Sequence, residues 1–290
     1  MCHTIDSMRK ILIVASVIVG FALPVIAQIS EGDQHWNARA EGQKGGHAKT
    51  TRIDAAIAAY RTAVTQDPSS LEARWKLLRA LRFKGAYVAA TSVEKKQIYA
   101  MAKTDGDAAM AIINRQLLAK GVKAGASEKN VAETARAIPG TALVFYWDSV
   151  NWGEWALAYG KMAAVREGAA DRIRREATIA MLIDPKTDGG GPQRVLGRLH
   201  DQTPRIPFLT GWASSREAVR FLKESYKIDP TNKITRVFLA DAMVSDNSGS
   251  GPEAIRILRE VINSPNDPNY EVEGARAQED AKALLREWGA

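Results

Sequence analysis

A run of three glycines, Gly189 to Gly191, followed by Pro192, is the first stretch whose composition suggests chemistry. Glycine-rich loops that open a helix can bind phosphate through their backbone N–H groups. This run lacks the Gly-Lys-Ser/Thr ending of a phosphate loop, and Pro192 removes one N–H donor. The stretch therefore favours a plain turn before a helix that begins near Pro192.

His200 follows in the same expected helix and is the second candidate, as a general base or a metal ligand. It is the only histidine of the predicted repeat region, because His35 and His47 precede that region, so no two-histidine metal spacing exists. No Gly-x-Ser-x-Gly motif occurs, and the carboxylates are scattered rather than paired in apolar surroundings. The pattern predicts a packed, non-catalytic histidine and neither metal nor cofactor; a hydrolase that uses His200 is the weaker alternative.

An aromatic stretch combines large apolar side chains with one amide, in the order Tyr146, Trp147, Asn151, Trp152 and Trp155. Helical spacing places Trp147, Asn151 and Trp155 on one face. Such a stripe is usually core, but a buried amide needs a partner, and a ligand cleft lined by aromatic residues has the same pattern. Both interpretations stay open. Three arginines, if they are not simply exposed to solvent, would supply charge to such a cleft: Arg194, Arg198 and Arg205.

The elements that must position these residues read as helical hairpins. Ala56, Tyr60, Ala63 and Pro68 have the offsets of the second helix of a tetratricopeptide repeat, in which small residues interlock with the first helix and proline ends the hairpin. The same offsets return later in the chain, ending at Pro230, and no long period-two alternation indicates a sheet. We expect an all-α fold of stacked tetratricopeptide-like hairpins, an α-solenoid.

When the chain is counted by the spacing of these hairpins, the glycine stretch belongs to a modified repeat. From Pro185 to Pro230 the chain advances 45 residues, about 11 more than one repeat. Two extra residues precede the first helix of this repeat, and nine form an inserted arm at residues 203–211. The arm and its neighbour contribute the remaining candidate residues for binding a ligand or partner: Arg205, Pro207 and Trp212.

The N-terminal region has the pattern of an export signal. Two cations precede an apolar run that ends in a small-residue site at Ala27, so residues 1–27 are expected to be a signal peptide cleaved after Ala27. Translation could start at Met1 or Met8, and the lone cysteine, Cys2, would be lost with the signal. We expect a periplasmic protein with a flexible segment at residues 28–52 and one helical-repeat domain at residues 53–290.

The charge balance argues against nucleic acid as a partner. The chain carries a formal net charge of +7, but no dense run of lysine and arginine is interleaved with aromatic residues. We interpret the basic charge as solvated helix faces.

Several motifs together resemble one family. Tyr146-Trp147 with Asn151-Trp152-Gly153, then GGGPQRVLGRLH, then PRIP followed by Gly211-Trp212, is similar to the T component of tripartite ATP-independent periplasmic (TRAP) transporters, often called TatT. The similarity runs over residues 53–283. It implies an all-α periplasmic protein without catalytic activity that binds the solute-binding protein of the transporter and offers a cleft or channel to a small apolar or organic-acid ligand.

The resemblance leaves other functions open. Some members are lipoproteins, whereas this chain has no cysteine at the predicted cleavage site, so membrane attachment is not implied. A periplasmic repeat adaptor in envelope assembly, unrelated to transport, is the first alternative. The sequence fixes neither the ligand nor the oligomeric state, and a homo-oligomer stays open.

Overall fold

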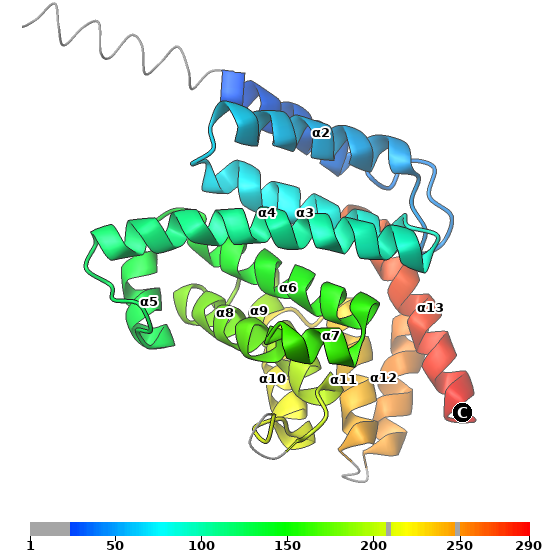
Figure 1. The fold of residues 1–290 in the computed structure, drawn as a ribbon. Coiled ribbons are helices and arrows are strands. Elements are labelled where there is room, and N and C mark those ends of the chain that lie inside the picture. Colours follow the sequence, from blue (N-terminus) through cyan, green and yellow to red (C-terminus); the bar gives the residue numbers. More distant parts are fainter. Residues whose placement is uncertain (1–23, 207–209, 247–249) are drawn as a thin grey trace, which may run out of the picture.

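The computed structural model describes residues 24–206, 210–246 and 250–290, so Pro207 and most of the predicted signal peptide lie outside the described residues. The described chain is all-α, as the sequence predicts, and its one β-type contact is an isolated bridge between Lys44 and His47. A helix over residues 24–37 comes first, and the later elements follow as drawn in Figure 1: α2 (Thr50–Gln66), α3 (Leu71–Tyr87), α4 (Ser92–Ala119), α5 (Glu128–Ala135), α6 (Thr141–Tyr159), α7 (Lys161–Arg166), α8 (Ala169–Ile183), α9 (Gly191–Gln202), α10 (Ser215–Ile228), α11 (Lys233–Ser245), α12 (Gly251–Asn263), the short 3-10 helix η1 (Pro268–Tyr270) and α13 (Glu271–Glu287).

The helices begin and end where side chains can satisfy the backbone. Thr91 forms a capping box with Glu94 at the start of α4, and Ser214 caps α10 by accepting from the N–H of Glu217. Helices α2, α8 and α10 each end at an aspartate that directly precedes a proline, namely Asp67, Asp184 and Asp229. The prolines used above to count the repeats therefore mark true helix boundaries.

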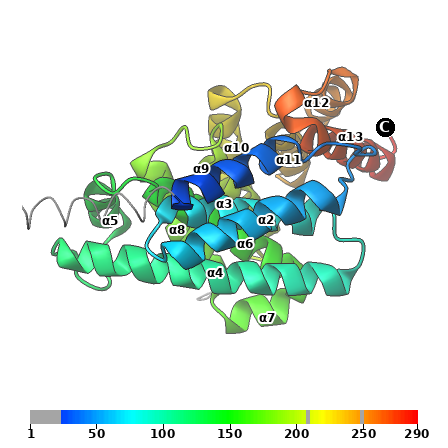
Figure 2. The same ribbon diagram turned by 90° about the horizontal axis from the view of Figure 1, so that it is seen from above.

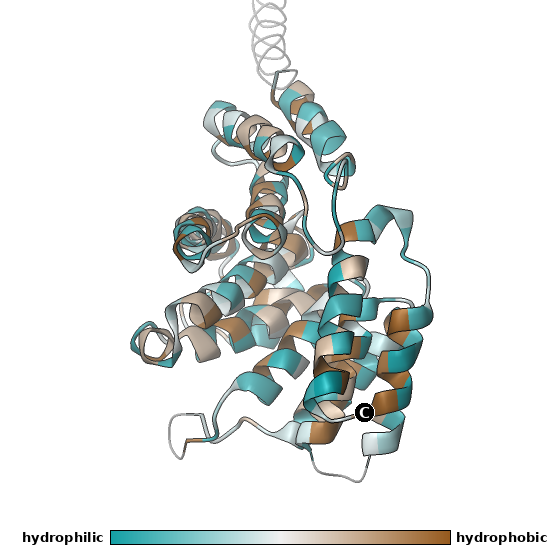
Figure 3. Cartoon of the chain, turned by 90° about the vertical axis from the view of Figure 1, so that its right-hand side faces the viewer, coloured by the Kyte–Doolittle hydropathy of each residue, from teal (hydrophilic) through white to brown (hydrophobic). Residues whose placement is uncertain are grey.

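Neighbouring helices pack as hairpins, and small residues set their spacing. Gly197 of α9 lies so close to α10 that an added Cβ would come within 2.5 Å of Leu222 and 3.1 Å of the Ala218 carbonyl oxygen. Contacts of α2 with α3, α9 with α10 and α11 with α12 continue the pattern. Figure 3 shows hydrophilic and hydrophobic residues along the same helices, as amphipathic repeats require.

Helices α4 and α6 build the larger core at the centre of the molecule. Phe145 and Val144 of α6 pack with Ile113 of α4 and Ile179 of α8 in one buried cluster. The long α4 crosses the face formed by α3 and α6, as Figure 1 shows. No helix in the described ranges is long and apolar enough to cross a membrane.

The segment at residues 28–52, which we predicted to be flexible, is packed instead. Its first part continues the helix over residues 24–37, and Ile29 is buried against Ala63 and Ala73 of the first hairpin. The prediction was wrong because several glycines suggested a linker, whereas the apolar residues between them face the hairpin. This helix also runs across the predicted cleavage position after Ala27.

The packed segment joins the two ends of the chain. Arg39 is buried and donates through Nε to Glu273 of α13 at 3.1 Å, and the N–H of Gly46 donates to Glu279 at 2.8 Å. Val272 belongs to the same buried cluster as the α2–α3 hairpin. Figure 2 shows the N-terminal segment beside α13, so the first and last parts of the described chain are in contact.

Candidate functional site

The aromatic stretch forms the core of α6 and does not line a cleft. Tyr146, Trp147, Trp152 and Trp155 are each less than a tenth exposed, and Asn151 is fully buried. The Asn151 amide donates to the Leu78 carbonyl at 3.0 Å and to the Trp147 carbonyl at 2.8 Å. The NH2 group of the amide therefore has its partners in the backbone of α3 and α6, whereas its Oδ1 is buried without a partner among the described residues; the burial of the whole stretch favours the core interpretation over a ligand passage.

Tyr146 and Arg194 are brought together, although not in a cleft of the kind we expected. The Tyr146 hydroxyl donates to Asp188 at 2.6 Å, and Arg194 donates to the same carboxylate at 2.7 Å and to the Tyr146 hydroxyl at 3.1 Å. Burial raises the pKa of Tyr146, with Asp188 adding to it, so the hydroxyl stays protonated. Arg194 is only 7% exposed, so simple solvent exposure does not describe it. The cluster ties α6 to α9.

The glycine run makes this contact possible. Gly189 and Gly190 have positive φ angles of 60° and 77°, a conformation that favours glycine. A Cβ on Gly191 would lie 2.6 Å from the Tyr146 ring. The glycines therefore serve a turn and a close approach of helices, as the missing phosphate-loop ending predicts.

His200 is held by packing and one backbone hydrogen bond. Its Nδ1 accepts from the Ser214 N–H at 3.2 Å, and its ring lies between Trp212, at 5.2 Å, and Phe221, at 5.7 Å. Burial lowers the pKa of His200, which keeps the imidazole neutral. Arg174 lies over the Trp212 ring, with its guanidinium carbon 4.5 Å from the ring centroid. The arrangement joins α9 to α10 through a packed histidine.

The other two candidate arginines have different surroundings. Arg198 bridges Asp201, at 2.8 Å, and Asp241, at 2.7 Å, and so links α9 to α11. Arg205 is exposed on the inserted arm. The candidate residues thus separate into a buried α6 core, three helix-joining clusters and an exposed arm.

One charged cluster was not identified from the sequence. The Arg172 guanidinium of α8 donates to Glu176 at 2.9 Å, to Asp107 at 2.6 Å and to Asp148 at 2.7 Å. Asp148 is fully buried and Glu176 is 5% exposed. An added Cβ on Gly106 would meet the Asp148 carboxylate at 1.8 Å, so only glycine fits at this point of α4.

The two buried carboxyl groups of this cluster influence each other. Burial raises the pKa of Glu176 well above its usual value, and the charge of Asp148 raises it further against the opposing effect of Arg172. Burial also raises the pKa of Asp148, although Arg172 lowers it. The sequence offered two signals, an aspartate within the aromatic stretch and an arginine four residues before a glutamate. Neither signal showed that these three side chains meet in the fold.

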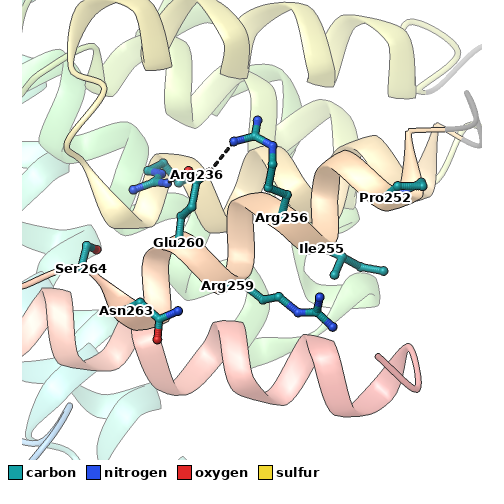
Figure 4. A pocket seen from close by; sticks show the side chains of 8 residues that line it. All are labelled: Arg236, Pro252, Ile255, Arg256, Arg259, Glu260, Asn263 and Ser264. Atoms are coloured by element: carbon teal, nitrogen blue, oxygen red, sulfur yellow. Dashed lines mark hydrogen bonds and ion pairs between the residues drawn. The ribbon is translucent and has the colours of Figure 1, made fainter.

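Two hollows occur beside the described helices. One, of about 640 Å³, lies along α4 and α8 next to Arg172 and Glu176. The other, of about 540 Å³, is a surface hollow beside α12 where Glu260 pairs with Arg236 and Arg256, and Arg259 also lines this hollow (Figure 4). We regard the first as the better candidate because it combines apolar walls with a buried acid, whereas Glu260 is exposed.

The described residues contain no group of three histidine, cysteine, aspartate or glutamate side chains arranged to hold a metal ion. The described geometry thus offers an exposed arm, helix-joining clusters and an apolar cavity with a charged end. No known family model matches this chain, and no curated protein matches it as a relative.

Proposed function

We propose that the protein is a non-catalytic periplasmic helical-repeat protein that binds the solute-binding subunit of a TRAP-type transporter. Support comes from the stacked hairpins, from the TatT-like motifs, and from the structural roles of the residues that would otherwise suggest catalysis. Burial lowers the pKa of His200, its ring packs against Trp212 and Phe221, and its Nδ1 accepts from the Ser214 N–H.

The observation that carries the proposal is the inserted arm. Arg205 is exposed, and Ile206 is 42% exposed, although isoleucine is usually buried. The base of the arm is fastened by Thr210, whose hydroxyl donates to the Pro204 carbonyl and accepts from the Ile206 N–H at 3.1 Å. A fixed base that presents a cation beside an apolar side chain suits protein recognition, in which arginine is a common anchor.

The ligand passage expected beside the aromatic stretch is not part of this proposal. Trp147, Asn151 and Trp152 are buried and would have to leave the core to contact a ligand. The arm alone is therefore assigned to partner binding.

Binding can be measured by calorimetry between the protein and the solute-binding subunit of a TRAP-type transporter from the same source. We expect the double variant Arg205→Glu, Ile206→Ser to weaken binding at least tenfold, because it reverses the charge and removes the apolar contact. Arg256→Glu on the exposed face of α12 is the matched control and should bind like the original protein. Unchanged binding by the arm variant would contradict the assigned interface, and no binding by the original protein would contradict the proposed partner.

A further inference from the structure

The cavity along α4 and α8 is a trough that is partly open to solvent. Phe145 of α6 is buried at its floor, and Arg172 reaches Asp107 across one end. At the other end Arg175 donates to the Ala126 carbonyl at 2.7 Å and fastens the loop after α4. The walls are mostly apolar and comprise Met110, Ala111, Leu117, Leu118, Val122, Ala124, Val131 and Ile179. The trough has the size and lining of a small-molecule site.

The Arg172 end holds more acid than base. Three carboxyl groups surround the single guanidinium, and the buried carboxyl groups of Asp148 and Glu176 are close enough to hydrogen-bond each other through a shared proton. Glu176 itself lines the cavity. Two adjacent buried carboxyl groups cannot both stay ionised at low cost, so the pair retains a proton unless another cation arrives.

We propose that this cavity binds a small organic ammonium ion, with the cationic nitrogen at Glu176 and the apolar group along the Phe145 floor. The ammonium group donates to the Glu176 carboxylate, which lines the cavity, and the proton that Glu176 and Asp148 share is released to solvent. A carboxylate placed there would instead face Glu176 and Asp148. The proposal does not depend on the partner of the arm.

Other charges around the cavity do not cancel this preference. Arg175 is engaged by Glu128 at 3.1 Å, and Lys103 of α4 is placed between Asp107 and Glu167. Lys123 lines the cavity from the loop after α4, the loop that Arg175 fastens at the end opposite Arg172. The cation should therefore settle at the Glu176 end, and the apolar group should extend toward Val122.

Three probes of equal chain length separate charge from hydrophobicity. Calorimetry of the full chain at neutral pH with hexylammonium, hexanoate and hexanol should show binding only, or at least tenfold tighter binding, for hexylammonium. Titrations in two buffers of different ionisation enthalpy should reveal proton release on binding. Equal or tighter binding of hexanoate or hexanol, or binding of none of the three, would overturn the proposal.

Two variants place the binding in this cavity. Glu176→Gln should weaken hexylammonium at least tenfold, because the amide cannot offer a charge, whereas Glu260→Gln in the α12 hollow should change nothing. Ala111→Trp fills the trough from an exposed position of α4 and should abolish binding even if Glu176→Gln folds poorly. If folded Glu176→Gln or folded Ala111→Trp binds hexylammonium as tightly as the original protein, the site lies elsewhere.

Discussion

At the scale of single residues, the buried acid pair makes stability depend on pH in an unusual direction. Both Glu176 and Asp148 have raised pKa values in the folded state because they are buried. The folded protein therefore holds a proton that the unfolded chain has released above the ordinary glutamate pKa of 4.5. The stability from this pair is complete below that pH and is lost as pH rises through the raised folded pKa.

We predict that Glu176→Gln removes this loss. The amide keeps the size of the side chain without a charge, so the unfolding free energy of the variant relative to the original protein should rise as pH increases above the ordinary glutamate pKa of 4.5. Urea unfolding at several pH values measures the difference. The exposed Glu260→Gln control should differ from the original protein by the same amount at each pH, and a pH-independent effect of Glu176→Gln would contradict the shared proton.

Residue types alone did not reveal which polar groups are buried. Asn151 was recognisable as an anomaly within an aromatic stripe, and the structure supplies its partner in the Leu78 carbonyl, 73 positions away in sequence. Arg194 and Asp188 are close in sequence, but Tyr146, the third member, is 48 positions from Arg194. Long-range pairing of this kind depends on helix packing that a single sequence does not encode locally.

At the scale of elements, repeats were predictable because packing imposes a regular spacing. Small residues such as Gly197 and Ala218 recur where two helices of a hairpin approach, so the pattern gave α9 and α10 together with their register. The helix over residues 24–37 was not predicted, because it belongs to no repeat and is positioned by the hairpin beneath it. The number of residues between the repeats revealed the arm, but it did not reveal that the Thr210 hydroxyl holds the base of the arm together.

Helix approach also yields a prediction for Gly191. Replacement by alanine places a Cβ against the Tyr146 ring and must displace that buried ring or α9, which should cost about 1–3 kcal/mol in unfolding free energy. Gly153→Ala on α6 is the matched control, because no atom lies within 4 Å of its added Cβ. There the better helix propensity of alanine should be neutral or stabilising by up to about 1 kcal/mol.

Urea denaturation followed by circular dichroism compares the two alanine variants. A Gly191→Ala protein as stable as the Gly153→Ala protein would show that α9 can move away from α6 at little cost. That result would weaken the structural explanation of the glycine run.

At the scale of the whole molecule, contact between the two ends distinguishes this chain from an open solenoid. Repeats in an open row touch only their neighbours, so the ends can fray independently. Here Arg39 bonds Glu273 and the Asn269 carbonyl, and Gly46 bonds Glu279, which couples the first and last helices. The chain should therefore unfold more cooperatively than a row with free caps.

Arg39→Ala tests this coupling. The Arg39 and Glu273 side chains are 7% and 10% exposed, so removing the cation leaves a buried carboxylate without its charge partner and should cost about 3–5 kcal/mol. Arg256→Ala, which breaks an exposed pair with Glu260 on α12, should cost less than about 1 kcal/mol. Amide hydrogen exchange should then show faster exchange in α13 and in α2 together for Arg39→Ala, because the contacts of Arg39 with α13 stabilise both helices. Faster exchange confined to residues around position 39, with α13 protected as before, would mean that the ends touch without stabilising each other.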